Sequence, residues 1–132
     1  MLSWVPLRPP HARHILRVAI AIVFLSHGLT RAYMDRVVPF GVFLDAQGFP
    51  YGIAWAWGVT LLEIVGGVLL LANTCVRPLA ILYTVQMLFG IWLVHLANGW
   101  FVVGHGRDGV EYSFLIIAAC VALFASANTE GR

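Results

Sequence analysis

Charge is scarce in this sequence of 132 residues, and lysine is absent. Only 11% of the residues are charged, whereas 61% are hydrophobic; soluble domains are typically about 25% charged. The mean hydropathy is +0.87. A chain of this composition cannot cover itself with polar side chains, which excludes a soluble globular domain. The net charge of +2 is too small to indicate a nucleic-acid partner.

Cysteine pairs and metal-binding patterns are also missing. The two cysteines, Cys75 and Cys120, lie far apart and form no CxxC motif. Their spacing argues against a dithiol redox motif and against a disulfide scaffold. The five histidines occur without HxxxH, ExxH or Cys/His clustering. The sequence therefore predicts no metal site.

Four apolar stretches dominate the rest of the chain, and they cover residues 15–33, 53–71, 79–97 and 111–126. A bilayer core about 30 Å thick is crossed by roughly 20 apolar residues in a helix, so each stretch predicts a span. Residues 35–52 are too polar and too broken to cross, and they predict a short helix or loop in the membrane interface. The predicted fold is an all-α integral membrane protein, with residues 1–132 forming one antiparallel four-helix transmembrane domain.

The distribution of arginine predicts the orientation in the membrane. The side that carries both termini receives Arg8, Arg13, Arg17, Arg77 and Arg132, and the other side receives Arg31, Arg36 and Arg107. The positive-inside rule therefore places both termini in the cytoplasm. Residues 1–14 contain three prolines and predict an irregular or interfacial lead-in, and the N-terminal arginines suit an anionic membrane surface. No small-x-small cleavage site follows the first apolar stretch, which favours a retained span over a signal peptide.

Ionisable side chains gather in the outer half of the predicted bundle. Glu63 lies in the middle of the second stretch and shares a helix face with glycines three and four residues later, so we expect it to face a neighbouring helix. A carboxyl group is costly in lipid, so Glu63 is either protonated or paired with His27, Arg31 or His95. Such a cluster either locks the helices together or handles protons or ligands. The candidate site residues are Glu63, His27, Arg31, His95, Glu111 and Gln86.

Several segments of the chain carry a resemblance to a known family. They read RVAIAIVFLSHGLTR at 17–31, FGVFLDAQGFP at 40–50, LLEIVGGVLLL at 61–71 and HLANGWFV…GVEY at 95–112, with an arginine turn at Arg77. In this order and spacing they resemble the DoxX family of small four-helix bacterial membrane proteins. The resemblance implies a bundle in the bacterial inner membrane and, for some members, a partnership with quinone-linked oxidoreductases such as thiosulfate:quinone oxidoreductase. The chain departs from the family at Arg31, where many members have lysine, and in its ending, ASANTEGR.

Two functional hypotheses follow from the polar cluster and the resemblance. In the first, the protein is a membrane subunit of a redox system that binds a quinone or lipid-like molecule in the outer-half pocket. His27 and Arg31 would then bind a carbonyl or acidic group, Glu63 would orient the ligand or exchange a proton, and His95 and Glu111 would close the site. In the second, the protein is a non-catalytic scaffold that docks a redox partner protein or a second copy. Neither hypothesis requires a covalently bound cofactor, and both leave open whether the protein is an enzyme.

Overall fold

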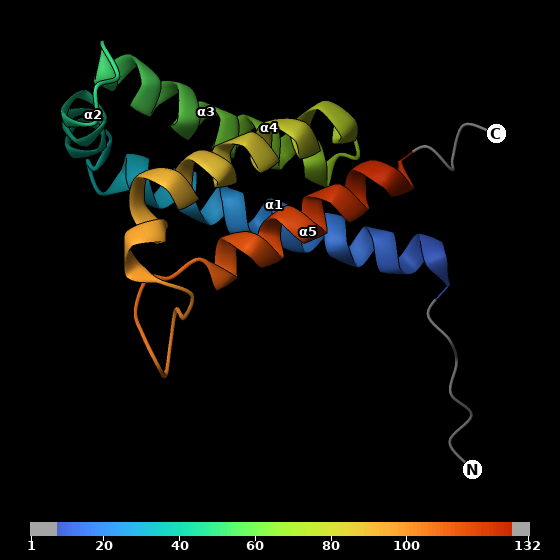
Figure 1. The fold of residues 1–132 in the computed structure, drawn as a ribbon. Coiled ribbons are helices and arrows are strands. Elements are labelled where there is room, and N and C mark those ends of the chain that lie inside the picture. Colours follow the sequence, from blue (N-terminus) through green and yellow to red (C-terminus); the bar gives the residue numbers. More distant parts are fainter. Residues whose placement is uncertain (1–7, 128–132) are drawn as a thin grey trace.

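The computed structural model describes residues 8–127, and in that range the chain is helical, with no strand (Figure 1). A π-helical turn, Ile91–His95, and a 3₁₀ turn, Leu96–Asn98, continue the fourth helix. The five α-helices are α1 (Pro9–Tyr33), α2 (Val37–Ala46), α3 (Gly52–Leu71), α4 (Val76–Gly90) and α5 (Glu111–Ser126). The predicted all-α class is confirmed, and the segment left open as a short helix or loop contains the helix α2.

The first helix begins earlier than the sequence pattern predicts. It starts at Pro9 and not at residue 15, so an irregular lead-in is wrong for residues 9–14; residues 1–7 lie outside the described range. Pro9 and Pro10 occupy its first two positions, where a helical N–H has no intrahelical partner and the fixed φ of proline suits the helix. Prolines that would break a helix interior therefore begin this one.

Three helical stretches are long and apolar enough to cross a membrane. They are Pro9–Tyr33, Gly52–Leu71 and Val76–Asn98. The helix α5 has 16 residues, which span about 24 Å at 1.5 Å per residue. That length is shorter than a hydrocarbon core about 30 Å thick.

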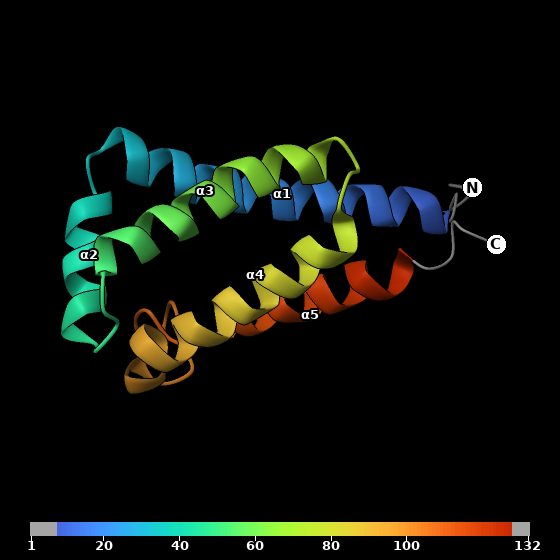
Figure 2. The same ribbon diagram turned by 90° about the horizontal axis from the view of Figure 1, so that it is seen from above.

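The helices associate as two pairs. The helix α1 packs along α3, and α4 packs along α5, with smaller contacts of α1 with α5 and of α3 with α4. The helix α2 lies across the end of this assembly opposite the termini and packs on α3 (Figures 1 and 2). Figure 2 shows the α4–α5 pair inclined to the α1–α3 pair, so the two pairs diverge toward the end that carries α2.

An aromatic stack joins α1 to α4 in the core. The rings of Phe24 and Tyr83 are parallel, with centroids 3.7 Å apart, and neither side chain is more than 2% exposed. The Tyr83 hydroxyl donates a hydrogen bond to the Leu62 carbonyl oxygen, 3.1 Å away on α3. Gly66 lies beside this hydroxyl, where a Cβ atom would come within 2.5 Å of it. The small residue therefore lets the tyrosine bring three helices together.

Arg17 is buried, although the sequence assigns it to a basic cluster at the membrane surface. Its side chain is 5% exposed, and its Nη1 atom donates to the carbonyl oxygens of Leu70 and Leu71, the latter 2.8 Å away. Its Nη2 atom donates to Nδ1 of His14, also 2.8 Å away. The last carbonyls of a helix lack intrahelical partners and carry partial negative charge. Arg17 therefore fixes α1 to the C-terminal end of α3.

A close approach of backbones joins α2 to α3. A Cβ atom on Gly41 would lie 2.7 Å from the Ile53 Cα atom, so only glycine fits at this point. The Asp45 carboxylate accepts a hydrogen bond of 2.9 Å from the backbone N–H of Gly52, the first residue of α3. That N–H has no partner inside the helix, so Asp45 both caps α3 and holds the corner.

Replacing Arg17 by leucine should destabilise the fold, because two α3 carbonyl oxygens lose their donor inside the protein. We expect the free energy of unfolding to fall by about 1–3 kcal/mol, the cost of leaving buried polar groups unpaired. Reversible unfolding in mixed detergent and SDS micelles measures it. The matched control is Arg8→Gln, at the exposed residue before α1, and equal stability of the two variants would contradict the assigned role.

Candidate functional site

A buried ion pair joins the middle of α3 to the last turns of α1. The Glu63 side chain is 3% exposed, and its Oε2 atom lies 2.6 Å from Nη1 of Arg31. The Oε1 atom accepts a hydrogen bond of 2.6 Å from Nε2 of Gln86 on α4 and a longer one, 3.4 Å, from Nη2 of Arg31. The prediction that Glu63 faces neighbouring helices is confirmed. Of the three basic partners that the sequence offered, the structure selects Arg31.

Thr60 completes the environment of the arginine. Its hydroxyl oxygen accepts a hydrogen bond of 3.2 Å from Nη1 of Arg31 and donates its own proton to the Ala56 carbonyl oxygen, 2.7 Å away. The residue is fully buried. Thr60 precedes Glu63 by three positions, and this spacing places two side chains on the same face of a helix. Helical spacing around Glu63 would have identified Thr60, which the sequence analysis missed.

Gly28 allows α1 to come close enough for this pairing. A Cβ atom at this position would lie 2.8 Å from Cγ1 of Ile64 and 2.9 Å from Cβ of Glu63. Real side chains do not tolerate such distances, so α1 would have to move away from α3. Because Arg31 is one turn after Gly28, that movement would also withdraw its guanidinium group from the carboxylate.

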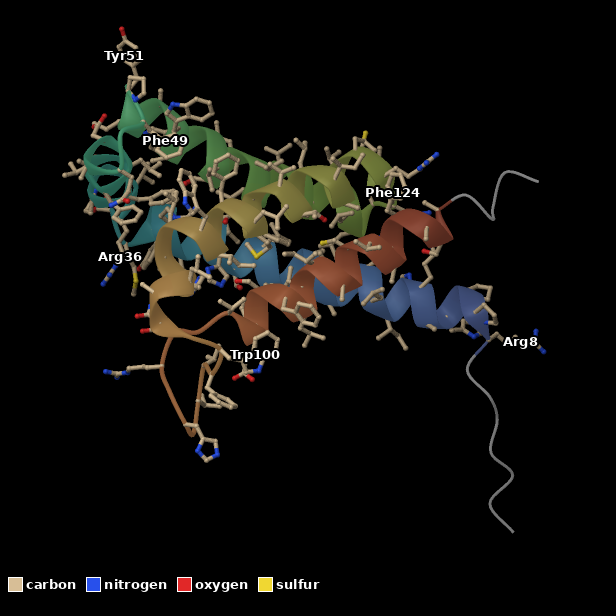
Figure 3. The ribbon with its side chains drawn as sticks, in the orientation of Figure 1. Arg8, Arg36, Phe49, Tyr51, Trp100 and Phe124 are labelled. Carbon is tan, nitrogen blue, oxygen red and sulfur yellow. The ribbon has the colours of Figure 1, made fainter. Side chains whose placement is uncertain are left out.

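Arg31 also lines a groove between the C-terminal part of α1 and the start of α2. The groove has a volume of about 820 Å³. The Phe40 ring forms part of its wall, with its centroid 4.9 Å from Cζ of Arg31, and Figure 3 shows Arg36 at the same end of the molecule. The groove is lined by Ser26, His27, Thr30, Arg31, Met34, Asp35, Arg36, Pro39 and Phe40.

The six predicted site residues separate into three groups. Arg31, Glu63 and Gln86 form the buried cluster. His27 is exposed in the groove next to Arg31 and makes no hydrogen bond with residues 8–127. His95 and Glu111 bond instead to the loop that precedes α5. Nδ1 of His95 donates to the Asp108 carbonyl oxygen at 2.7 Å, and Oε1 of Glu111 accepts from the Val102 N–H at 2.7 Å.

Within the described range, no three His, Cys, Asp or Glu side chains lie together as a set that could hold a metal ion. The groove contains another hydroxyl that can donate a hydrogen bond, that of Thr30, whereas the Ser26 hydroxyl already donates to the Val23 carbonyl oxygen at 2.7 Å. The chemistry available there is thus recognition of an acceptor-bearing head group by nitrogen and hydroxyl donors, next to an aromatic wall.

A double-mutant cycle on Arg31→Met and Glu63→Leu should show strong coupling between the two side chains. Either single change leaves one buried charge without its partner, which typically costs about 3–5 kcal/mol. The double variant should lose clearly less free energy of unfolding than the sum of the single variants. Arg36→Met, at the exposed arginine that precedes α2, is the control, and additive losses would contradict the pairing.

Gly28→Ala and Gly58→Ala form a second matched test of the approach between α1 and α3. Gly28→Ala should lower the free energy of unfolding by about 1–3 kcal/mol, as overpacking does. Gly58 has no atom within 4 Å of an added Cβ, so Gly58→Ala should leave stability unchanged or raise it by up to about 1 kcal/mol through helix propensity. Equal effects in thermal unfolding would contradict the close approach at Gly28.

Comparison with known proteins gives one family. The family model described as DoxX matches residues 12–96, well over half of the 132 residues. No curated protein and no solved structure matches the chain. The matched region contains the ion pair and the groove. It also contains the three stretches that are long enough to cross a membrane, except for the first residues of Pro9–Tyr33 and the last residues of Val76–Asn98. The chain therefore belongs to the DoxX family, and it is a multi-pass membrane protein.

Proposed function

We propose that this DoxX protein is the membrane subunit of a redox system and binds a quinone or a similar lipid-like molecule in the groove beside Arg31. The exposure of a polar side chain at membrane depth carries the proposal. His27 lies six residues before the end of α1, about 9 Å along the helix axis. A polar group facing lipid without a partner is unfavourable. A ligand with carbonyl oxygens in the groove would give His27 an acceptor.

Arg31 has hydrogen-bond donors left for such a ligand. A guanidinium group carries five N–H donors, and its bonds to Glu63 and Thr60 involve both Nη1 hydrogens and one Nη2 hydrogen. The Nε hydrogen and the second Nη2 hydrogen remain. The volume of about 820 Å³ falls in the range of roughly 300–1,000 Å³ that is usual for small-molecule sites. A planar head group would fit beside Phe40, with its tail in the surrounding lipid.

The residues of the chain would have distinct tasks in this complex. A bound quinone supplies two-electron, two-proton redox chemistry to a partner protein. His27 and Arg31 would donate hydrogen bonds to its carbonyl oxygens. Glu63 would hold the guanidinium group in place and balance its charge, since both carboxylate oxygens already accept hydrogen bonds.

The same proposal includes the arrangement in the membrane. We place α5 as a fourth span, which completes an antiparallel four-helix bundle in the bacterial inner membrane. The packing of α5 along α4 and its contact with α1 support this assignment. The arginine distribution supports cytoplasmic termini, with the groove near the outer face. A redox partner protein or a second copy of the chain would complete the system.

A non-catalytic scaffold is the second candidate. It is favoured by the hydrogen bonds that both Glu63 carboxylate oxygens already accept within the chain. Arg31 and Gln86 occupy both carboxylate oxygens and thereby join α1, α3 and α4. In this interpretation the cluster only locks the helices, and the groove has no ligand. The two candidates differ in the expected effect of a change at His27, which lies outside the cluster. A ligand site predicts that the change weakens ligand binding, whereas a scaffold predicts no effect on ligand binding.

Binding of short-chain ubiquinone and menaquinone analogues to the purified protein in lipid nanodiscs tests the proposal. We expect saturable quenching of tryptophan fluorescence and a dissociation constant raised about tenfold by His27→Ala, the loss of roughly one hydrogen bond. Phe40→Leu should also weaken binding.

His11→Ala serves as the matched control, because His11 is an exposed histidine at the opposite end of α1. Its affinity for the quinone analogues should equal that of the unaltered protein. Absence of saturable binding, or equal affinity of the His27→Ala and His11→Ala proteins, would reject the groove as a quinone site and favour the scaffold.

A further inference from the structure

Residues 99–110, here called the arm, connect α4 and its terminal turns to α5 and lie beyond the matched residues 12–96. The two limbs of the arm are bonded to each other at the base. The Gly109 N–H donates to the Phe101 carbonyl oxygen at 3.1 Å, and the Val110 N–H donates to the Gly99 carbonyl oxygen at 3.0 Å. The arm leaves the bundle sideways, across the direction of the helices, at the same end as α2 (Figure 1).

His95 and Glu111 each hold one limb of the arm. The carboxylate of Glu111 accepts the Val102 N–H, and its own backbone N–H donates to the Trp100 carbonyl oxygen at 2.9 Å. The ring of His95 bonds to the carbonyl oxygen of Asp108 on the other limb. These two polar side chains take no part in the groove beside Arg31. Their observed contacts serve to fix the orientation of the arm.

The arm exposes large apolar side chains next to an apolar face of α5. Trp100, Phe101 and Val103 are 49%, 42% and 74% exposed. The Trp100 ring packs against Phe114 with centroids 5.5 Å apart, and Figure 3 shows it beside the first turn of α5. Phe114 and the next residue, Leu115, are themselves mostly exposed. The apolar surface of the arm therefore continues the apolar surface of α5.

The length of α5 explains why such a continuation is needed. Its 16 residues fall about 6 Å short of a hydrocarbon core about 30 Å thick. A short span is accommodated when flanking residues extend its apolar surface or anchor it at the interface. Tryptophan and other aromatic side chains prefer the headgroup level of a bilayer. An arm directed along the membrane surface, with these residues beside the first turn of α5, supplies the missing length.

We propose that the arm lies in the lipid headgroup region of the outer leaflet, where Trp100, Phe101 and Val103 supply the apolar surface that α5 lacks. The partner is the lipid itself. Arg107, exposed on the same arm, is suited to lipid phosphate groups. His95 and Glu111 are positioning residues, since they set the direction of the arm and take no part in its contact with lipid. This inference rests on the proposed placement of α5 as a fourth span and on the proposed orientation, and it is independent of what binds beside Arg31.

Site-directed spin labelling of the full chain tests the placement. Cys75→Asn removes the exposed thiol with a residue that tolerates its φ of 55°, while Cys120 is fully buried and does not react. The label is attached at Val103→Cys in vesicles of phosphatidylethanolamine and phosphatidylglycerol. References are Leu115→Cys on the exposed face of α5 and the same spin label coupled to glutathione, which stays in the aqueous phase.

Accessibility to molecular oxygen, relative to a water-soluble nickel chelate, reports the depth of the label. The ratio at position 103 should approach that at position 115 and exceed that of the glutathione conjugate several-fold. Glu111→Ala should shift it toward the value of the conjugate, whereas Glu111→Gln should preserve it because the amide oxygen still accepts the Val102 N–H.

Three results would overturn the proposal. A ratio at position 103 equal to that of the glutathione conjugate would place the arm in water. Low accessibility to both reagents, with an immobilised spectrum, would indicate a protein partner, and dipolar broadening that disappears on dilution with unlabelled protein would indicate a second copy. If Glu111→Ala does not fold, the comparison of position 103 with position 115 and the conjugate decides alone.

Discussion

The ion pair between Arg31 and Glu63 is the constraint on which the half of the molecule that carries α2 depends. A carboxylate in the middle of a membrane span has no water to hydrate it, so its partner must come from another helix. The pairing needs α1 and α3 to be in close contact, which Gly28 permits, and Thr60 accepts a further hydrogen bond from Nη1 of Arg31. Gln86 then brings α4 to the same carboxylate. One buried charge therefore determines the relative positions of three helices.

A second arginine gives α1 a fixed point at its other end. Arg17 bonds to the last carbonyl oxygens of α3, and the two arginines are fourteen residues apart, about 21 Å along the helix. The α1–α3 pair is thus held at two levels. The α4–α5 pair reaches α3 through fewer contacts, among them Gln86 and the Tyr83 hydroxyl. This difference agrees with the divergence of the two pairs seen in Figure 2.

Hydropathy was sufficient to predict the helical class and most helix boundaries, because apolar stretches in lipid must satisfy their backbone within a helix. It was also sufficient to predict that Glu63 is buried between helices. It could not choose between His27, Arg31 and His95 as the partner, because sequence gives depth along a span but not the direction in which a side chain points around the bundle. The prediction for Arg17 was wrong for a related reason. Its charge predicts a place in the basic cluster at the membrane surface, whereas its side chain is buried against the last carbonyl oxygens of α3.

The separation of the predicted polar residues into three groups changes how a function should be assigned. The similar depth of these side chains along the spans predicts a single pocket. In the structure some of them are hydrogen-bonded within the chain and others are not, and only the unbonded donors are available to a ligand. Glu63, Gln86, His95 and Glu111 each have a partner within the chain, so their first role is to hold helices or the arm in place. A membrane protein recognises a ligand through the donors that its own fold leaves open. In the described part of this chain, His27 and the remaining donors of Arg31 meet that condition at the groove beside the C-terminal part of α1, and under the proposed function the hydrogen-bonded residues only support them.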